Sequence, residues 1–336
     1  MPSFSRAVRN LPRIIFLTRK VGCYIINVKR GSRLLGDGME FNMKKVRLLI
    51  SLLLLAILTL GLSSCKFSLG SFEKIQYKDA DKYTVGDGAL EREASRIEID
   101  WICGDIRIVR GEVSAITFSE QSAATLDEKH RLHYYFDGDT LRLKCAKSGT
   151  RALNFPLKTL TVTLPEGVEL DIVEIKSVSA NIRVEEQIID NLFVDTVSGN
   201  AEIGVSLAGT LDLKTVSGNT AIALDGTASK VELESVSGDL ALVGNAKNLF
   251  SESVSGTLAL MLDGCPQNLE CESVSGNIHL SLPEDSGFRL EYDTTSGDLD
   301  CEISTRKVGE EYIAGDGVAS FEIETTSGDL KITARR

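Results

Sequence analysis

A five-residue phrase recurs eight times in the second half of the chain, and it restricts the possible fold more than any other feature. The phrase is Ser/Thr-Val/Thr-Ser-Gly-Asn/Asp in most copies. A period near 20 residues is typical of a repeat architecture, in which each unit is stable only when packed on its neighbours. The central serines are Ser179, Ser198, Ser217, Ser237, Ser255, Ser275, Ser296 and Ser327, at successive intervals of 19, 19, 20, 18, 20, 21 and 31 residues.

Apolar and polar residues alternate on both sides of each phrase. Around Ser198, for example, apolar Leu192 and Val194 precede the serine, and Ala201 and Ile203 follow it at matching offsets. Alternation with a period of two indicates half-buried strands. Each repeat is therefore predicted to contain a strand, a corner, a second strand and a variable return loop.

The corner residues explain why the chain has 29 Gly but only 6 Pro. Gly allows a backbone conformation that a Cβ would oppose, and Asn or Asp beside it can cap a turn. Ser and Thr hydroxyls can satisfy backbone groups at a bend. The predicted structural corners contain Ser179, Ser198, Gly199, Asn200, Ser217, Gly218, Asn219, Ser237, Gly238, Asp239, Ser255, Gly256, Ser275, Gly276, Asn277, Ser296, Gly297, Asp298, Ser327, Gly328 and Asp329. The first corner departs from this pattern, with Ala180 in place of Gly.

The conserved offsets favour an all-β, parallel β-solenoid, because equivalent residues stack when neighbouring rungs are parallel and in register. A degenerate copy of the pattern surrounds Cys103, which occupies the position of the central serine. We therefore expect about nine or ten rungs between roughly residues 92 and 334, about 50 Å long at ~4.8 Å per rung. The alternative is a two-sheet β-sandwich built from the same units.

Charge divides the chain into two unlike parts. Residues 1–64 contain 11 of the 37 Lys and Arg residues but only 2 of the 48 Asp and Glu residues, which leaves a net charge of −20 on the remainder. Nucleic-acid binding requires a basic surface. The composition therefore argues against a nucleic-acid partner.

The basic part contains a signal-peptide pattern. A short cationic start at Met43–Arg47 precedes the uncharged segment 48–64, which is shorter than a membrane-spanning helix requires. The segment ends in Leu-Ser-Ser-Cys65, which resembles a lipobox, so we predict lipidation of Cys65 and attachment to a membrane. An ordinary secretory signal with an incidental cysteine is the alternative.

These patterns suggest four regions. Residues 1–42 are a non-native or disordered extension if translation starts at Met43, and residues 43–64 are a lipoprotein signal peptide. Residues 65–91 are expected to be a linker after the lipid anchor, and residues 92–336 a β-repeat domain. The predicted location is the cell envelope, on the extracytoplasmic side.

Alternative chemistry receives little support from the sequence. A hydrolase would need a base for its serine, yet the only histidines are His130, His133 and His279. His130 and His133 could contact a metal, and the Asn/Asp column could bind calcium, but the glycine-dense nonapeptide of calcium-binding rolls is absent. Acidic residues occur on every rung rather than as one distinct acid and base pair, which disfavours a polysaccharide-active enzyme. We expect no catalytic residue, metal or cofactor.

The cysteines after Cys65 show no zinc-site spacing. Cys271 and Cys301 fall in apolar columns and are predicted to be small buried residues. A disulfide between Cys265 and Cys271 is conceivable in an oxidising compartment. The two remaining cysteines after Cys65 and before these are Cys103 and Cys145.

The sequence resembles the bacterial "putative adhesin" family, also called toast-rack domains. The resemblance rests on the serial Val-Ser-Gly-Asn/Asp corners, on residues 164–171 before the first clear repeat, and on the Thr-Thr-Ser-Gly-Asp-Leu sequence at 325–330; it covers roughly residues 95–332. It implies an envelope-associated β-repeat protein of largely unknown activity, and it supplies no catalytic residue.

Two functional hypotheses follow. The first is a lipid-anchored, non-catalytic binding, adhesion or scaffold surface that presents acidic faces to an envelope protein or glycan. The second is a regulatory partner of a membrane protein in envelope-stress sensing.

Overall fold

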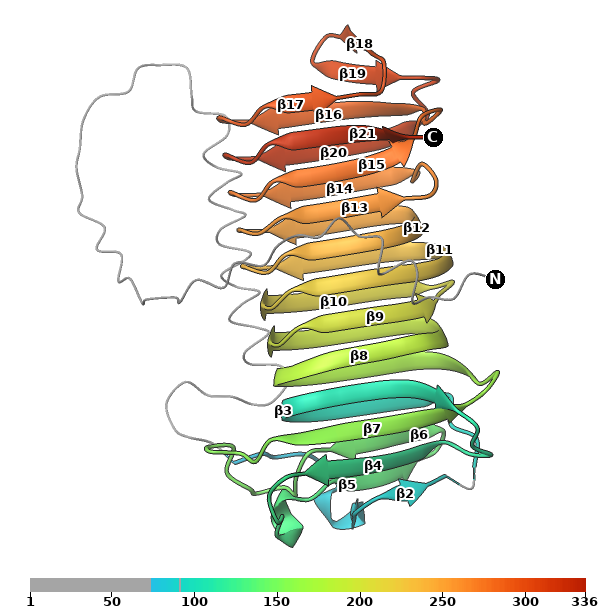
Figure 1. The fold of residues 1–336 in the computed structure, drawn as a ribbon, viewed down its shortest axis with the longest axis vertical. Helices are drawn as coiled ribbons and strands as arrows, with labels where there is room; N and C mark the ends of the chain where they lie inside the picture. Colours follow the sequence, from blue (N-terminus) through green and yellow to red (C-terminus); the bar gives the residue numbers. More distant parts are fainter. Residues whose placement is uncertain (1–73, 91) are drawn as a thin grey trace, which may run out of the picture.

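The computed structural model describes residues 74–90 and 92–336, and they form one long stack of β-rungs (Figure 1). The predicted extension (1–42), signal peptide (43–64) and lipidation site (Cys65) lie outside the described residues. In the described part, no helix is both long and apolar enough to cross a membrane.

The strands account for most of the described chain. Two short 3-10 helices, η3 (Ala80–Lys82) and η4 (Glu128–His130), lie near its start. The strands are β1 (Thr84–Val85), β2 (Gly88–Ala89), β3 (Arg96–Gly111), β4 (Thr117–Ser122), β5 (His133–Asp137), β6 (Thr140–Lys144), β7 (Lys158–Pro165), β8 (Glu169–Ser198), β9 (Ala201–Ser206), β10 (Thr210–Ser217), β11 (Thr220–Ser235), β12 (Leu240–Ser253), β13 (Leu258–Leu262), β14 (Asn268–Ser273), β15 (Ile278–Pro283), β16 (Phe288–Thr294), β17 (Leu299–Cys301), β18 (Thr305–Val308), β19 (Glu311–Ala314), β20 (Ala319–Thr325) and β21 (Leu330–Arg335).

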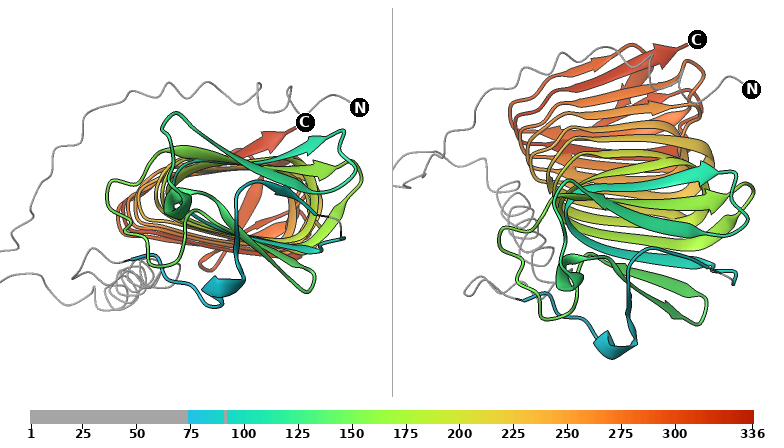
Figure 2. Two further views of the ribbon diagram at one scale, coloured as in Figure 1. Left: turned by 90° about the horizontal axis from the view of Figure 1, so that it is seen from below. Right: turned by 60° about the horizontal axis from the view of Figure 1, so that its bottom comes forward.

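Each rung has two sides, and the stack viewed from its end is a flattened tube (Figure 2). One side contains the strand segments before the corners, and the other contains those after them. Equivalent residues stack in parallel register: Leu211 of β10 lies between Leu192 of β8 and Val231 of β11. The parallel β-solenoid is thus confirmed, and the β-sandwich alternative is wrong.

The first repeat is not the first rung of the stack. The rung formed by β3 lies between the β6–β7 rung on one side and β8 on the other, and all of these pairings are parallel. Cys103 of β3 stands opposite Ser179, and Gly104 opposite Ala180, which confirms the degenerate copy predicted around Cys103. Beyond this end, β5 covers β6 and β4 covers β7 in antiparallel pairs.

The C-terminal end also departs from chain order. The last rung in the sequence, β20–β21, pairs with β14–β15 on one side and with β16–β17 on the other. The chain therefore skips one rung position, builds β16 and β17 beyond it, and returns to fill the gap. The β18–β19 hairpin lies between β17 and β20 in the sequence, and its residues account for the 31-residue interval between Ser296 and Ser327.

The core consists of apolar columns that run along the stack between its two sides. Leu192, Leu211, Val231 and Leu249 are all fully buried in one such column. A neighbouring column contains Ser251, whose buried hydroxyl has no hydrogen-bond partner among the described residues. Close packing of like residues at a fixed spacing is what makes the single repeats interdependent.

The region expected to be a linker contains structure from residue 74 onwards. β1 pairs with β5, β2 pairs with β4, and Ile75 and Leu90 are buried. These segments extend the sheets past the β6–β7 rung, so the folded part begins before residue 92. These segments carry no copy of the repeat. The predicted start of the domain at residue 92 was based on the repeat pattern alone, so it missed them.

Candidate functional site

Glycine is required at the corners because successive corner backbones nearly touch. A Cβ on Gly238 would lie 1.9 Å from the carbonyl oxygen of Gly218, and one on Gly276 would lie 1.9 Å from that of Gly256. Some corner glycines, such as Gly218 with φ +145°, also have a backbone conformation that other residues rarely adopt. The predicted structural role of the glycine column is therefore explained by close approach as well as by backbone conformation.

The central serine of each phrase links its rung to the neighbouring rung. Ser198 Oγ donates a hydrogen bond to the Val178 carbonyl (3.3 Å), and Ser237 Oγ donates one to the Val216 carbonyl (3.2 Å). Equivalent bonds are made by Ser179, Ser217, Ser255, Ser275, Ser296 and Ser327.

The Asn/Asp column forms a second ladder. Asn200 Oδ1 accepts a hydrogen bond from the Asn219 backbone N–H at 3.0 Å, and Asn219 Oδ1 accepts one from the Asp239 N–H at 3.1 Å. The ladder follows the spatial order of the rungs at the C-terminal end too, where Asp329 Oδ1 accepts from the Asp298 N–H. The hypothesis that this column binds calcium is disfavoured, because these side-chain oxygens accept hydrogen bonds from backbone N–H groups. Asn181, Asp239 and Asn277 make equivalent bonds.

A third column, which the sequence analysis did not single out, fixes the corner from inside. Ser235 is buried, and its hydroxyl both accepts from the Gly238 N–H (3.0 Å) and donates to the Gly238 carbonyl (3.2 Å). Ser273 makes the same pair of bonds with Gly276. The signal was present in the sequence, since the residue two positions before each central serine is always Ser or Thr.

The outer surface of the pre-corner strands is the strongest candidate for binding. Nine carboxylates from five adjacent strands point outward there, and we call them the acidic face. Strands in this ladder are ~4.8 Å apart, so like charges are neighbours along each column. The acidic face comprises Glu232 and Glu234 of β11, Glu252 of β12, Glu270 and Glu272 of β14, Glu322 and Glu324 of β20, and Glu291 and Asp293 of β16.

The two halves of this surface differ in charge balance. Towards the N-terminal end, Arg142 pairs with Glu98 (2.6 Å) and Lys144 pairs with Asp100, each across neighbouring strands. Lys214 lies 2.7 Å from Glu234, and Lys230 lies 2.6 Å from Glu232 on the same strand. At the C-terminal end, Arg289 of β16 lies 3.5 Å from Glu311 of β19. Between these positions, no ion pair with Lys or Arg is found among the described residues for Glu252, Glu270, Glu272 and Glu322.

Burial and mutual repulsion shift the titration of this surface. Partial burial, followed by the charges of Glu252 and Glu324, raises the pKa of Glu272 to about 7. Burial, together with nearby carboxylates, also raises the pKa of Glu252, and it raises the pKa of Asp212 to about 6. A folded chain that holds these groups together in ionised form is less stable than one with neutral side chains there.

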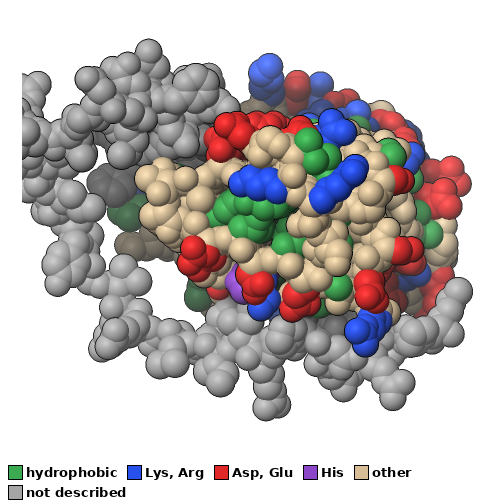
Figure 3. Space-filling model, turned by 90° about the horizontal axis from the view of Figure 1, so that it is seen from above, with side chains coloured by type: hydrophobic (Ala, Val, Ile, Leu, Met, Phe, Trp, Pro, Cys, Tyr) green, Lys and Arg blue, Asp and Glu red, His purple; other side chains and the backbone are tan. Residues whose placement is uncertain are grey.

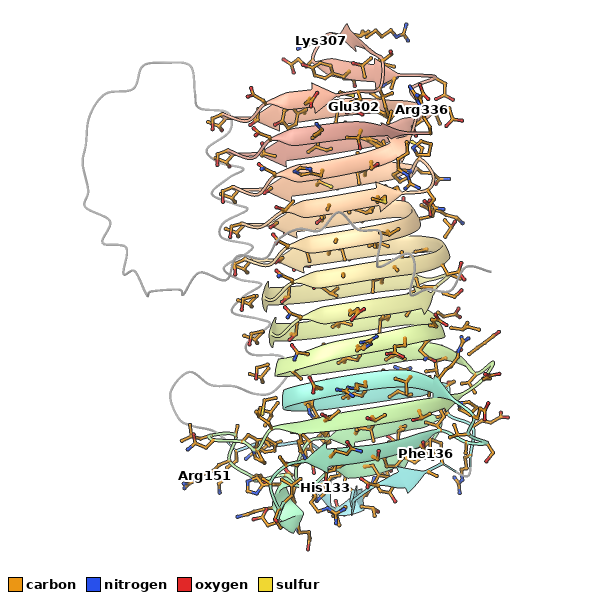
Figure 4. All side chains as sticks on the ribbon, viewed as in Figure 1. His133, Phe136, Arg151, Glu302, Lys307 and Arg336 are labelled. Atoms are coloured by element: carbon orange, nitrogen blue, oxygen red, sulfur yellow. The ribbon has the colours of Figure 1, made fainter. Side chains whose placement is uncertain are left out.

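The histidines do not form a metal centre. His130 Nδ1 contacts the Asp127 carboxylate, whereas His133 Nδ1 lies 2.9 Å from the Arg131 carbonyl. Both residues lie at the N-terminal end of the stack, where Figure 4 labels His133. No group of three or more His, Cys, Asp or Glu residues is arranged to hold a metal ion in residues 74–90 and 92–336.

The conceivable disulfide between Cys265 and Cys271 is absent. Cys271 is fully buried in an apolar column opposite Ser251, and burial raises the pKa of its thiol. Cys265 is exposed in the loop before β14 and is not bonded to Cys271. The Cys271 side chain points into the core, which prevents it from reaching a partner in a surface loop.

Comparison with known proteins identifies the family. The model of the Toastrack DUF4097 family matches residues 94–333, which is most of the chain. The chain belongs to this family. No curated protein matches this Toastrack chain significantly.

Several solved structures are similar to this Toastrack domain. A "putative adhesin" from Bacteroides fragilis shares 16% identity with a TM-score of 0.44, covering 77% of this chain and 99% of its own. One from Parabacteroides distasonis shares 16% identity with a TM-score of 0.47, covering 74% and 97%. One from Parabacteroides merdae shares 14% identity with a TM-score of 0.43, covering 77% and 98%. Such values do not support the transfer of a ligand or an activity.

The corner glycines allow two stability costs to be measured separately: the cost of a Cβ that meets a neighbouring backbone, and the cost of an unusual backbone conformation. We expect Gly238→Ala to lower the free energy of unfolding by about 3 kcal/mol, because the new Cβ meets a backbone carbonyl that cannot move without breaking the ladder. Gly226→Ala is the control: Gly226 has φ +91° but open space around it, so about 1 kcal/mol is expected. Urea denaturation measures both, and an equal or smaller loss for Gly238→Ala would contradict this account.

The two serines of one corner are predicted to differ in importance. Ser235→Ala leaves the buried Gly238 N–H without its acceptor and should lower the free energy of unfolding by about 1–3 kcal/mol. Ser237→Ala removes a hydrogen bond from an exposed hydroxyl and should cost about 0.5 kcal/mol. Thermal and chemical denaturation of the two variants measure the difference, and the reverse order would refute the internal role of the third column.

The raised pKa of Glu272 predicts a pH-dependent stability. The folded chain binds this proton more tightly than the unfolded chain between the ordinary pKa of 4.5 and about 7, so stability from this group falls as pH rises through that window. Glu272→Gln should therefore raise the free energy of unfolding by about 1 kcal/mol at pH 8, allowing for solvent screening, and change it little at pH 4. The exposed Glu112→Gln serves as control, and equal effects of the two variants at pH 8 would disprove the prediction.

Proposed function

We propose that this protein is a lipid-anchored, extracytoplasmic protein of the bacterial cell envelope that binds a polycationic partner on its acidic face without catalysing a reaction. The acidic face carries this proposal. It places nine carboxylates on five strands that are neighbours in the sheet. Four of these carboxylates have no ion pair with Lys or Arg among the described residues. A rigid array of like charges favours a partner of opposite charge and speeds its association.

The anchor and location rest on the sequence. The cationic start, apolar segment and Leu-Ser-Ser-Cys65 order is typical of a bacterial lipoprotein, and the diacylated cysteine would hold the protein at a membrane. The repeated corners use their serines in structural hydrogen bonds, which supports a binding role over a hydrolytic one.

Binding of a defined cationic probe tests the proposal. A 20-residue poly-lysine peptide should bind the full chain in non-ionic detergent at 50 mM NaCl, and Glu270→Gln/Glu272→Gln/Glu322→Gln/Glu324→Gln should weaken it at least tenfold. The control Glu112→Gln/Asp225→Asn/Glu284→Gln/Glu310→Gln removes equal charge from exposed positions outside the acidic face, and less than threefold weakening is expected. Isothermal titration calorimetry measures each affinity, and equal losses in the two variants would overturn the assignment of the acidic face.

The natural partner can be identified by crosslinking in intact cells, followed by purification from membranes. A Cys65→Ser variant, expected to leave the membrane fraction, controls for the anchor. Recovery of a basic envelope protein or polymer by the wild type, and its loss from the acidic-face variant, supports the proposal. A partner retained equally by both would contradict it.

A further inference from the structure

The segment 151–157 between β6 and β7, which we call the leucine loop, presents apolar side chains to solvent. Leu153 and Leu157 are 55% and 71% exposed, although leucine is usually buried. Phe155 between them is half-buried and packs against the core, with its ring centre 5.6 Å from Lys158 Nζ. Asn154 has φ +54°, a turn conformation that asparagine tolerates. The loop therefore holds both leucines outward around one packed ring.

The leucine loop is joined to the first described residues of the chain. Lys74 forms an antiparallel bridge with Arg151, which Figure 4 labels at the N-terminal end of the stack. The Ile75 N–H donates a hydrogen bond to the Thr150 carbonyl at 2.8 Å, and the Gly149 N–H donates one to the Ile75 carbonyl at 2.6 Å. Ile75 is also buried. The point at which the chain joins the fold is thus fixed beside the two exposed leucines.

The predicted lipidation site is close to this point in the sequence. Cys65 precedes Lys74 by nine residues, which span at most about 30 Å when fully extended. Acyl chains on Cys65 would therefore keep Lys74, and Arg151 beside it, within about that distance of a bilayer. The leucine loop lies where a lipid surface is within reach.

Exposed apolar side chains also occur at the opposite end of the stack. Val308 of β18 and Val318 before β20 are 52% and 81% exposed. Figure 3 views this end and shows apolar side chains among charges of both signs. Exposure alone therefore does not select a lipid surface. The anchor does, because the chain that carries it joins the fold beside the leucines and far from the valines.

The charge of the leucine loop suits lipid phosphates. Residues 145–157 contain Lys147 and Arg151 but no Asp or Glu. Arg151 and Lys74 are both exposed, and no ion pair is found for either of them among the described residues. Basic side chains beside apolar ones are typical of segments that lie in a membrane interface.

The carboxylates on the neighbouring elements η4 and β3 are already paired. η4 packs against the loop, where the Thr150 hydroxyl donates a hydrogen bond to the Lys129 carbonyl (3.1 Å). The two acidic side chains at the start of η4 lie 3.5 Å from Lys129 Nζ and 3.4 Å from Lys147 Nζ. Asp105 of β3, which lines a hollow beside the loop, lies 3.8 Å from Arg107. These elements therefore place no unpaired acidic group against the loop.

We infer that the leucine loop rests on the bilayer in which Cys65 is anchored, with both leucines at the boundary of the acyl chains and with Arg151 and Lys74 at headgroup phosphates. This inference rests on the anchor in the proposed function and deepens it. The acyl chains supply the attachment, and the loop supplies a second contact with the same surface. A guanidinium group is well suited to phosphate, because its planar donors can bond two oxygens at once.

This second contact sets the orientation of the stack on the membrane. The loop belongs to the rung of β6 and β7, and β3, β8 and β10 lie between this rung and β11 in the sheet. β11 carries the first carboxylates of the acidic face. The acidic face is therefore held away from the phosphates of the membrane surface, which would repel it, and it remains open to a cationic partner.

Quenching of tryptophan fluorescence by brominated lipid tests the contact. The chain has one tryptophan, Trp101, which is buried, so the wild type gives the baseline. The full lipid-modified chain is placed in vesicles of phosphatidylcholine and phosphatidylglycerol that carry bromine near the middle of the acyl chains. Leu157→Trp should lose at least half of the fluorescence that its added tryptophan contributes. Val318→Trp, at the opposite end, should lose less than about a tenth.

A second substitution tests whether the loop enters the bilayer. Adding Leu153→Asp to the Leu157→Trp variant should at least halve the quenching, because a carboxylate opposes entry into an apolar environment. Adding Val308→Asp to the same variant is the matched control, and it should leave the quenching unchanged. An equal effect of the two additions would contradict the inferred contact.

Flotation of the same vesicles in a density gradient separates this inference from the anchor. A chain that floats, but whose Leu157→Trp variant is quenched no more than its Val318→Trp variant, would overturn the membrane contact and leave the anchor intact. A chain that does not float would contradict the anchor and the contact together. Crosslinking of the leucine loop to an envelope protein in cells, without quenching by lipid, would assign the loop to a protein partner and also overturn the inference.

Discussion

The close approach of neighbouring corner backbones is the constraint on which the rest of the stack depends. Backbone hydrogen bonds fix the spacing of the rungs, so a corner cannot move away from the carbonyl oxygen beneath it. At Gly238 a Cβ would lie 1.9 Å from that oxygen, and only glycine fits. Once the corners are fixed in register, the central serines and the Asn/Asp residues bond to backbone groups of the neighbouring rung, and most of the buried Ser/Thr residues bond to the backbone of their own corner. Thr215 is an exception, since its buried hydroxyl has no hydrogen-bond partner among the described residues.

The parallel register places like residues next to each other, whether or not their contact stabilises the folded chain. In the interior it aligns Leu with Leu and produces a continuous core. On the outside it aligns Glu with Glu, as for Glu252, Glu272 and Glu324, and raises the pKa of Glu272. The N-terminal half relieves this repulsion with Arg and Lys on neighbouring strands, whereas Glu252, Glu270, Glu272 and Glu322 have no ion pair with Lys or Arg among the described residues.

The sequence predicted the middle of the stack well because residues about 20 positions apart in the chain are neighbours in space. The displaced Cys103 copy was also recognisable, since its columns match those of Ser179. The ends could not be predicted in the same way. Nothing in the local pattern indicates that β20 enters between β14 and β16, or that residues 74–90 extend the sheets without a repeat. At the candidate site, the abundance of Glu was evident, but its separation into balanced and unbalanced halves depends on which strands pair.

The late insertion of β20–β21 has a consequence for how the chain folds during synthesis. Rungs in the middle contact partners about 20 residues back, so each can add to the growing stack soon after it is made. β16 and β17, in contrast, have no rung directly beneath them until the final residues appear, because β20 supplies the bridge from β14. Synthesis of the C-terminus is thus the step that joins the last rung to the rest, and a chain shortened before residue 319 would lose β16 and β17 from the stack although their sequence is intact.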